Sequence, residues 1–234
     1  MRSAVKKSIS KLHRMLPVEI TVRRRGKSGA DLDPLEHNTE TGWNRTFSNK
    51  RVLSQYISAG RTELYDAIHE ICLNSLPPTA SRCVIGDVGC GLGDLLRIVS
   101  ESYPVSAAYG YDFAKAPLDE AAKRFPGGTF SQHNIYDAPA RQHDLTICSQ
   151  TLEHLVDPDI ALARLVEWTK PGGVIVLTVP DGRLDSYSGH INFWSLESWR
   201  SFVRKNVGGL KHEVVPIPPK SARIGNLGAV VFTS

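Results

Sequence analysis

Apolar runs of strand length alternate with amphipathic stretches of helix length through the middle of the chain. The strand-like runs lie at residues 83–88, 107–112, 128–132, 144–149 and 174–179. The helical stretches between them lie near residues 94–102, 116–124 and 158–169. This β-α-β-α alternation predicts a parallel sheet that is covered by helices on both faces.

The pattern changes on both sides of this block. Residues 50–76 are amphipathic and stop at Pro77 and Pro78, which predicts one or two helices ahead of the sheet. After Pro180, the predicted elements are a helix at residues 195–206 and strands at 210–217 and 227–234. The last two strands are close enough in sequence to form an antiparallel pair.

Length and composition limit the chain to one substantial core. With 234 residues and 41% apolar content, it is short for two full domains. It contains no run of eighteen apolar residues, so no membrane-spanning segment is predicted. We expect a basic extension and polar linker at residues 1–42 and one domain at residues 43–234.

The four cysteines, Cys72, Cys83, Cys90 and Cys148, never approach CxxC spacing. Three of them lie in or beside strand-like runs, where reduced and packed thiols are expected. This distribution favours a reducing compartment and argues against a disulfide or zinc framework. We therefore expect a cytoplasmic protein, and no cluster in the sequence demands a metal.

Positive charge is concentrated in the N-terminal segment. Residues 1–27 hold nine Lys or Arg against one acid, Glu19, and carry +8, whereas the whole chain carries +4. The remainder of the chain is therefore mildly acidic. The apolar residues of the segment have the spacing of one helix face: Val5, Ile9, Leu12 and Leu16.

Several interpretations of this segment stay open. A basic amphipathic helix can lie on an anionic membrane or bind RNA. It is also similar to an organelle presequence, although its lysines and the lack of a cleavage signal weigh against one. A solvated extension fits as well, because no aromatic residues interleave the charges. The acidic remainder argues against nucleic acid and leaves an anionic membrane surface as the partner to test.

A glycine-rich turn with an acid at each end, "DVGCGLGD", follows the first strand of the sheet. In open α/β sheets, ligands bind at the carboxyl ends of strands, so this turn is the default site. The dinucleotide fingerprint GxGxxG requires a third glycine where Asp94 stands. Asp94 and Asp87 would repel a pyrophosphate at the helix N-terminus, so a cationic ligand without phosphate fits better.

The second strand ends in "YGYDF". Asp112 stands where a carboxylate can accept both hydroxyls of a ribose, and hydrogen bonds to a charged group are worth about 1.5–3 kcal/mol each. Phe113 can lie against an adenine face. A ribose, an adenine and a cation without phosphate together describe an adenosyl sulfonium.

Several motifs in order resemble those of the class I S-adenosylmethionine-dependent methyltransferases, over roughly residues 80–205. These are "VIGDVGCGLGDLL", "YGYDFAKAPLDEAAKRF" and "HDLTICSQTLEHLVDPDIALARLVEWTKPGGVIVLTVPD". The subgroup of ubiquinone-pathway and glycan-cluster methyltransferases is most similar. The resemblance implies a Rossmann-like, doubly wound, seven-stranded α/β sheet, mostly parallel, with S-adenosylmethionine as cofactor.

The resemblance also implies roles for individual residues. Asp87 would orient the methionine ammonium, Asp112 would hold the ribose and Phe113 would pack on adenine. Asn134 stands where the family commonly has an acid that contacts the adenine amino group. The full set of expected cofactor contacts is Asp87, Gly89, Cys90, Gly91, Gly93, Asp112, Phe113, Asn134, Ile135, Ser149 and Gln150.

Two histidines are candidates for catalysis, because a hydroxyl acceptor must lose a proton and an imidazole titrates near neutral pH. His154 lies in "LEHLVDP" and His190 in "SGHINFWS". In the resembled subgroup, a His at each place is common and lies near the acceptor. We expect His190 to be the base, and His154 to be either catalytic or an orienting residue.

The class of acceptor is inferred from the segments that are expected to cover the site. Aromatic and polar residues at 42–51 and at 181–194 suit a carbohydrate, and "GHINFWSLESW" is similar to methyltransferases of surface-polysaccharide clusters. We therefore expect O-methylation of a small molecule or a glycan precursor. The alternatives are an RNA or protein methyltransferase that uses the basic segment, and a non-catalytic protein that binds the adenosyl ligand.

Overall fold

The computed structural model describes residues 33–56, 59–76, 82–219 and 225–234. The basic segment at residues 1–27 and its predicted helix face lie outside the described residues. The structure therefore leaves the expectations for that segment as predictions. Within the part of the chain that is described, no helix has both the length and the apolar content that crossing a membrane requires.

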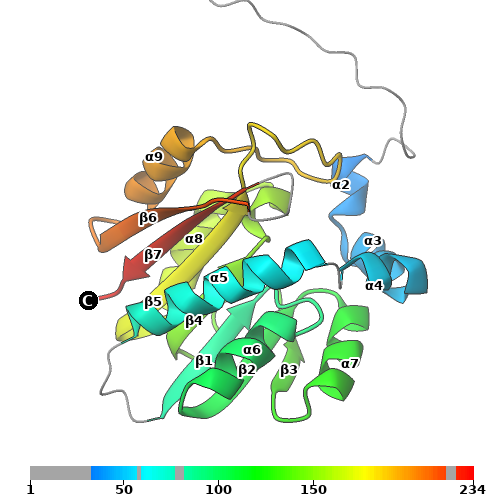
Figure 1. Cartoon of the computed structure of the whole chain (residues 1–234), viewed down its shortest axis with the longest axis horizontal. Helices are drawn as coiled ribbons and strands as arrows, with labels where there is room; N and C mark the ends of the chain where they lie inside the picture. The colour runs from blue at the N-terminus through cyan, green and yellow to red at the C-terminus, as the bar shows by residue number, and fades with distance from the viewer. Residues whose placement is uncertain (1–32, 57–58, 77–81, 220–224) are drawn as a thin grey trace, which may run out of the picture. The chain divides into compact units, whose positions relative to one another are not determined.

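A seven-stranded sheet forms the centre of the domain, with the order β3-β2-β1-β4-β5-β7-β6 (Figure 1). Its strands are β1 (Cys83–Val88), β2 (Val105–Asp112), β3 (Thr129–Gln132), β4 (His143–Ser149), β5 (Thr169–Pro180), β6 (Lys211–Ile217) and β7 (Asn226–Phe232). Every pairing from β3 to β5 is parallel, and β7 runs antiparallel between β5 and β6. The predicted parallel sheet with a final antiparallel pair is confirmed.

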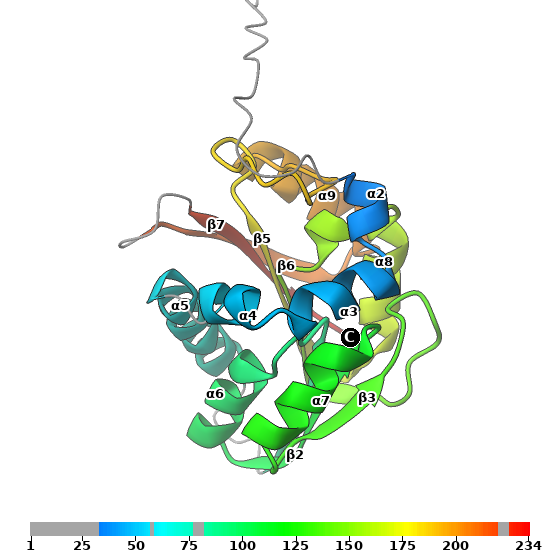
Figure 2. The same cartoon turned by 90° about the vertical axis from the view of Figure 1, so that its right-hand side faces the viewer.

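Helices cover both faces of this sheet, as the alternation predicts. Helices α5 (Ala59–Ser75) and α6 (Asp94–Ser102) pack over one face, and α8 (Pro158–Glu167) and α9 (Leu196–Asn206) over the other (Figure 2). Each face has its own apolar cluster. Leu96 of α6 is buried in one cluster, and Trp199 of α9 is buried in the other, where it donates to the Gly228 carbonyl at 3.2 Å.

The expected linker is helical over part of its length, which corrects that expectation. Helices α2 (Pro34–His37) and α3 (Glu40–Ser48) begin where local caps are available, and α4 (Lys50–Tyr56) follows. Asp33 accepts the N–H of Leu35 ahead of a first-turn proline, and Thr39 accepts the N–H of Gly42. The glycine-rich and acidic composition of residues 26–42 indicated a linker, because it does not reveal these local caps.

The strand order reverses between β1 and β4. The chain moves outward from β1 through β2 to β3 and then returns to β4 on the other side of β1. The carboxyl ends of these strands, with the loops that follow them, therefore border a crevice. Helix α7 (Lys115–Arg124), which follows β2, packs against α3 (Figure 2).

Candidate active site

A cavity of about 1000 Å³ opens where the strand order reverses, between β1 and β4. Its walls come from the glycine loop after β1, the ends of β2 and β4, helices α2 and α3, and the loop after β5. Ligand cavities in proteins are typically 300–1000 Å³. The cavity is large enough for a nucleoside-sized ligand and a second small molecule.

The glycine loop takes conformations that favour glycine. Gly89, Gly91 and Gly93 have φ values of 80°, 50° and 72°. A Cβ on Gly89 would lie 2.3 Å from the hydroxyl oxygen of Thr151, so the loop also packs closely on the segment after β4. The backbone N–H groups of Gly89 and Cys90 both donate to the carbonyl of Tyr111, which holds the loop against β2.

Gly93 and Cys90 serve the loop in different ways. Gly93 is the N-cap of α6 and is absent from the described residues that border the cavity, so its expected cofactor contact stays a prediction. A Cβ there would lie 2.9 Å from the ring of Phe130, so close packing explains the glycine. Cys90 borders the cavity, and burial raises the pKa of its thiol, which fits a packing residue and not a nucleophile.

Asp112 ties the end of β2 to the glycine loop. One carboxylate oxygen accepts the N–H of Gly91 at 3.1 Å, and the other accepts the N–H of Ala114 at 2.9 Å. Burial raises the pKa of Asp112 to about 6, although these N–H groups act in the opposite direction. Each oxygen has a further lone pair that can accept a hydroxyl of a ligand.

Asp87 lies at the bottom of the cavity, at the end of β1, and its exposed fraction is 2%. Burial raises the pKa of Asp87 to about 7, and the Asp112 carboxylate adds to the rise. A ligand cation beside Asp87 would favour its ionised form. The electrostatics of the loop therefore favour a positively charged ligand group and disfavour a phosphate.

The remaining expected cofactor contacts also border the cavity: Phe113, Asn134, Ile135, Ser149 and Gln150. Asn134 is exposed, and its side-chain oxygen already accepts the N–H of Tyr136 at 3.1 Å. Gln150 has a φ of 53°, which is rare for a residue other than glycine. Its backbone N–H and side-chain amide both bond to Thr178, so β5 holds this conformation at the edge of the site.

Both candidate histidines lie at the other end of the cavity. His154 ends a short 3-10 turn, η1 (Leu152–His154), and does not start α8. His190 comes from the loop after β5, and the two ring centroids are 4.6 Å apart. His190 Nδ1 lies against the Asp185 carboxylate, and its Nε2 lies 3.9 Å from Glu153 Oε1. The structure thus brings together residues that are 36 positions apart.

Aromatic rings surround this end of the cavity. Trp43 of α3 lies 5.0 Å from the His154 ring and 4.9 Å from the His37 ring, between centroids. The Tyr187 hydroxyl lies 3.1 Å from His37 Nε2, which joins the loop after β5 to α2. The expected aromatic cover is therefore present. Arg45, however, is exposed and does not border the cavity, and Trp194 packs on Trp199 in the core.

Residues 87–175 match the model of a family described as "Methyltransferase domain". This match starts at the first carboxylate of the site and ends within β5. Over this span, which is less than half of the chain, the protein is similar to methyltransferase domains. The sheet order with its antiparallel β7 is that of the Rossmann-like methyltransferase fold, as the sequence resemblance implies.

Curated relatives of the methyltransferase domain include trans-aconitate 2-methyltransferases. That of Acidovorax sp. (strain JS42) is 35% identical over 119 residues, which cover 50% of this chain and 46% of the relative. That of Methylobacterium nodulans is 31% identical over 105 residues, 44% of this chain and 41% of the relative. The chain spans about half the length of the curated relatives it matches.

Solved structures share the fold at low sequence identity. The N-methyltransferase NodS from Bradyrhizobium japonicum WM9, in complex with S-adenosylhomocysteine, has a TM-score of 0.66 and 18% identity, covering 84% of this chain and 98% of NodS. The plantazolicin methyltransferase BpumL, also in complex with S-adenosylhomocysteine, has a TM-score of 0.62 and 13% identity, covering 86% and 98%.

Sequence reasoning missed three residues of the site. His37 was hidden in a polar stretch that has the composition of a linker. Thr151 gave no signal, because only the close approach of Gly89 reveals its position. Asp185 was visible as one acid in a polar loop, but nothing in the spacing showed that its carboxylate holds His190.

Proposed function

We propose that the protein is an S-adenosylmethionine-dependent methyltransferase that methylates a hydroxyl of a small, polar and non-anionic acceptor, such as a sugar unit. One observation carries the proposal. A single cavity joins the two buried carboxylates of the glycine loop to the histidine and aromatic end near Trp43. This arrangement provides one end for an adenosyl ligand and another for an acceptor.

The residues of the first end fit the adenosyl cofactor. Asp87 would face the methionine ammonium, and the loop from Gly89 to Gly91 would surround the methionine part. Asp112 has acceptor capacity left for the ribose hydroxyls. Phe113 and Ile135 offer apolar surface to the adenine, with Asn134 at its edge. Ser149 and Gln150 also border the cavity and would line the sulfonium and its methyl group.

The bound cofactor supplies an electrophilic methyl group on a sulfonium. The chain's own task is to align the acceptor with that methyl and to exclude water. The lid formed by α2 and α3 serves the second purpose, since Asn38 donates to the Gly189 carbonyl at 2.8 Å. Asn44 of α3 accepts the N–H of Ala116 at 2.7 Å, so the lid is fixed to α7 as well.

The lining of the cavity supports a non-anionic acceptor. Among the described residues, the lining contains no Lys or Arg and holds acids such as Glu153 and Asp157. Recognition of a carboxylate typically uses Arg or Lys. The proposed acceptor therefore differs from the tricarboxylate named in the curated relatives. Trp43 and Tyr187 offer flat surfaces of the kind that pack on a sugar ring.

His190 is the sequence-based candidate for removal of the acceptor proton. The Asp185 carboxylate on Nδ1 would favour the tautomer whose Nε2 can accept a proton. His154 lies beside it and would position the acceptor oxygen. The role of His190 as a base stays a prediction. The Nε2 atom of His190 also lies near the Glu153 carboxylate.

The test is a titration followed by an acceptor screen. Calorimetry of the full chain with S-adenosylhomocysteine and, separately, with NADH should show micromolar binding of the adenosyl ligand alone. Transfer of labelled methyl from S-adenosylmethionine should then be found with glycosides and not with trans-aconitate. If the ligand binds and every acceptor stays unmethylated, the protein is a binding protein. Turnover of trans-aconitate would refute the proposed acceptor class.

A further inference from the structure

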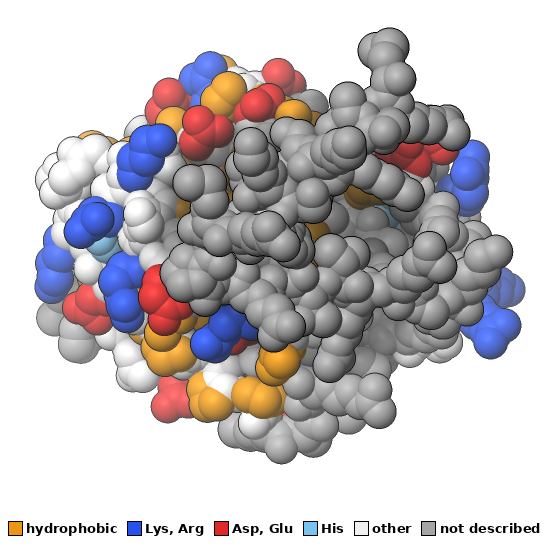
Figure 3. Space-filling view, turned by 90° about the horizontal axis from the view of Figure 1, so that it is seen from above, with side chains coloured by type: hydrophobic (Ala, Val, Ile, Leu, Met, Phe, Trp, Pro, Cys, Tyr) orange, Lys and Arg blue, Asp and Glu red, His pale blue; other side chains and the backbone are white. Residues whose placement is uncertain are grey.

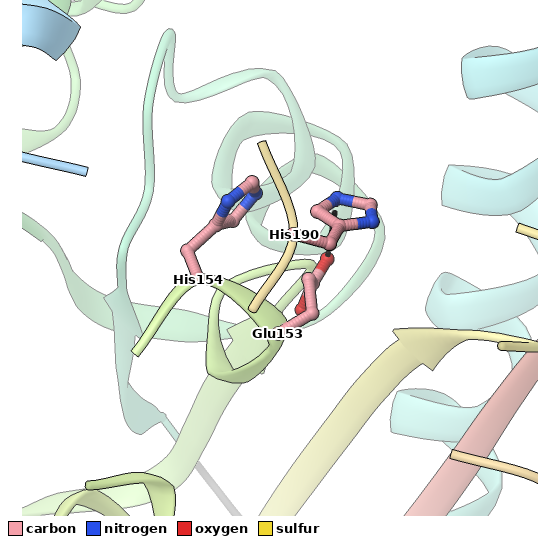
Figure 4. A group of neighbouring side chains, drawn as sticks. All are labelled: Glu153, His154 and His190. Atoms are coloured by element: carbon pink, nitrogen blue, oxygen red, sulfur yellow. Dashed lines mark ion pairs between the residues drawn. The ribbon is translucent and has the colours of Figure 1, made fainter. Parts of the chain in front are cut away.

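Glu153, His154 and His190 form a compact group at the acceptor end of the cavity. One ligand atom from each residue lies within 4.8 Å of the others. Glu153 and His154 come from the η1 turn, and His190 comes from the neighbouring loop, with the Glu153 carboxylate directed toward His190 (Figure 4). All three residues border the cavity. The group therefore faces the space that an acceptor would occupy.

In each of the two imidazoles, the Nδ1 atom lies beside an oxygen atom of the protein. His190 Nδ1 lies against the Asp185 carboxylate, and His154 Nδ1 lies 3.2 Å from the Gly189 carbonyl oxygen. An oxygen acceptor on Nδ1 places the ring proton there and gives Nε2 the lone pair. Histidines that bind metals almost always have this outer partner, which fixes the ring and raises its basicity.

The backbone also fixes the two segments against each other. The N–H groups of Ile191 and Asn192 both donate to the backbone carbonyl of Glu153, at 2.8 and 3.0 Å. The side-chain amide of Asn192 donates to the carbonyl of Leu155 at 2.7 Å. These bonds secure the loop that carries His190 directly to the turn that carries Glu153 and His154. The group thus has a built framework and does not depend on surface side chains.

The Glu153 side chain adds a carboxylate ligand to the two imidazoles. The residue has an exposed fraction of only 1%. A buried carboxylate is stabilised by a nearby positive charge, and an ion held by two imidazoles supplies one. Two histidines and one carboxylate are a donor set that suits zinc and the divalent ions of similar softness.

We propose that Glu153, His154 and His190 bind one divalent transition-metal ion of the zinc type. In the tetrahedral geometry that zinc prefers, ligand atoms with bonds of about 2.0–2.2 Å lie about 3.3–3.6 Å apart. Ligand atoms that are up to 4.8 Å apart would therefore approach each other by up to about 1.5 Å on binding, through rotation of the side chains. Sites with three protein ligands keep a position open for water or substrate. That position faces the cavity, where it suits an oxygen of the acceptor.

The proposal deepens the proposed function, because it assigns the ion to the acceptor end of the same cavity. It departs from the sequence-based expectation that no metal is present. It also excludes the expected base role, since a nitrogen that binds an ion cannot accept a proton. The role of His190 is therefore decided by whether the ion binds there.

The test measures metal binding directly and does not require an acceptor. The full chain is stripped with a chelator and titrated with Zn²⁺ by calorimetry, with Co²⁺ absorption as a second readout and Mg²⁺ for comparison. We expect one Zn²⁺ per chain and much weaker binding of Mg²⁺. His154→Ala and His190→Ala should each weaken Zn²⁺ binding at least 100-fold. Asp185→Asn should weaken it 10- to 100-fold, as loss of an outer partner does.

His212→Ala is the matched control, because His212 lies on β6, away from the cavity lining, and should leave Zn²⁺ binding unchanged. Each variant is first shown to bind S-adenosylhomocysteine as the wild type does, which separates loss of the metal site from misfolding. Absence of stoichiometric Zn²⁺ binding overturns the proposal, as does binding that the histidine variants leave unchanged. Preference for Mg²⁺ overturns the assignment of the ion. None of these outcomes depends on methyl transfer.

Discussion

Asp112 accepts the backbone N–H of Gly91 at 3.1 Å, so the carboxylate that ends β2 holds the loop that follows β1. The contact spans 21 positions of sequence and fixes the loop beside the cavity. In the proposed function the same carboxylate binds the ribose. The Asp112 side chain therefore has a structural role in the loop and a proposed role in binding the ribose.

Asp112→Ala should weaken binding of S-adenosylhomocysteine tenfold or more, because it removes both the ribose contact and the bond to Gly91. Calorimetric titration measures the effect. Asp119→Ala is the matched control, since Asp119 is an exposed aspartate on α7 that pairs with Lys115. An affinity that is equal in the two variants would show that Asp112 is not a ligand residue.

Binding of S-adenosylhomocysteine should tighten as pH rises through neutrality. Burial raises the pKa of Asp87 to about 7 in the ligand-free protein, and a methionine ammonium favours the ionised carboxylate. Below pH 7 the site must therefore release a proton on binding. We expect at least a tenfold gain in affinity between pH 5 and pH 8, because one coupled proton allows up to tenfold per pH unit.

Calorimetry in buffers of different ionisation enthalpy would count the released proton directly. Asp87→Asn should bind more weakly and with a smaller pH dependence over the same range, where Asp112, with a pKa of about 6, still titrates. A wild-type affinity that stays flat from pH 5 to pH 8 would show that the ligand has no cationic group beside Asp87.

The raised pKa of Asp87 also predicts how stability depends on pH. Between the unfolded value near 4 and the folded value of about 7, the folded protein binds more protons than the unfolded chain. The free energy of unfolding of the ligand-free protein should therefore fall as pH rises through this window, by an amount on the order of 3 kcal/mol from this residue. Urea unfolding of wild type and Asp87→Asn at pH 5 and pH 8 measures the difference. The variant should lose less stability than the wild type between the two pH values.

The parts of the fold that could be predicted from the sequence are those that local pattern determines. The run at residues 83–88 is apolar except for Asp87 near its end, as expected for a buried central parallel strand that leads into a site, and β1 has those bounds. The α2 and α3 helices could not be predicted in the same way. Their stability comes from caps at Asp33 and Thr39 and from packing over the cavity, which composition does not reveal.

The grouping of the expected cofactor contacts around one cavity was predictable because most of them lie directly after strands, and parallel strands bring their carboxyl ends together. Gly93 shows the limit of that reasoning, since close packing on the Phe130 ring already explains this glycine, and its contact with a ligand stays a prediction. The acceptor end depends on how two loops meet. No periodicity places His190 against Glu153, so their proximity had to come from the structure.

Gly89→Ala should destabilise the fold by about 2 kcal/mol more than Gly172→Ala. Both glycines have similar φ values, 80° and 76°, so the backbone cost of an added Cβ is about the same. A Cβ on Gly89 would meet the Thr151 hydroxyl at 2.3 Å, whereas one on Gly172 would meet nothing within 4 Å. The comparison therefore isolates the close packing of the glycine loop on Thr151. Denaturant unfolding of the two variants measures it, and equal losses would contradict the described loop geometry.

Tyr187→Ala should raise the KM for the acceptor and leave S-adenosylhomocysteine binding within twofold of wild type. Tyr187 borders the acceptor end of the cavity and contacts the His190 ring, with centroids 4.9 Å apart. Its ring would pack on the acceptor, and its hydroxyl holds the lid through His37. Leu184→Ala in the same loop is the control, because Leu184 is 62% exposed and does not border the cavity. If Tyr187→Ala weakens cofactor binding and acceptor binding alike, the two ends of the cavity are not separate, and the acceptor lies elsewhere.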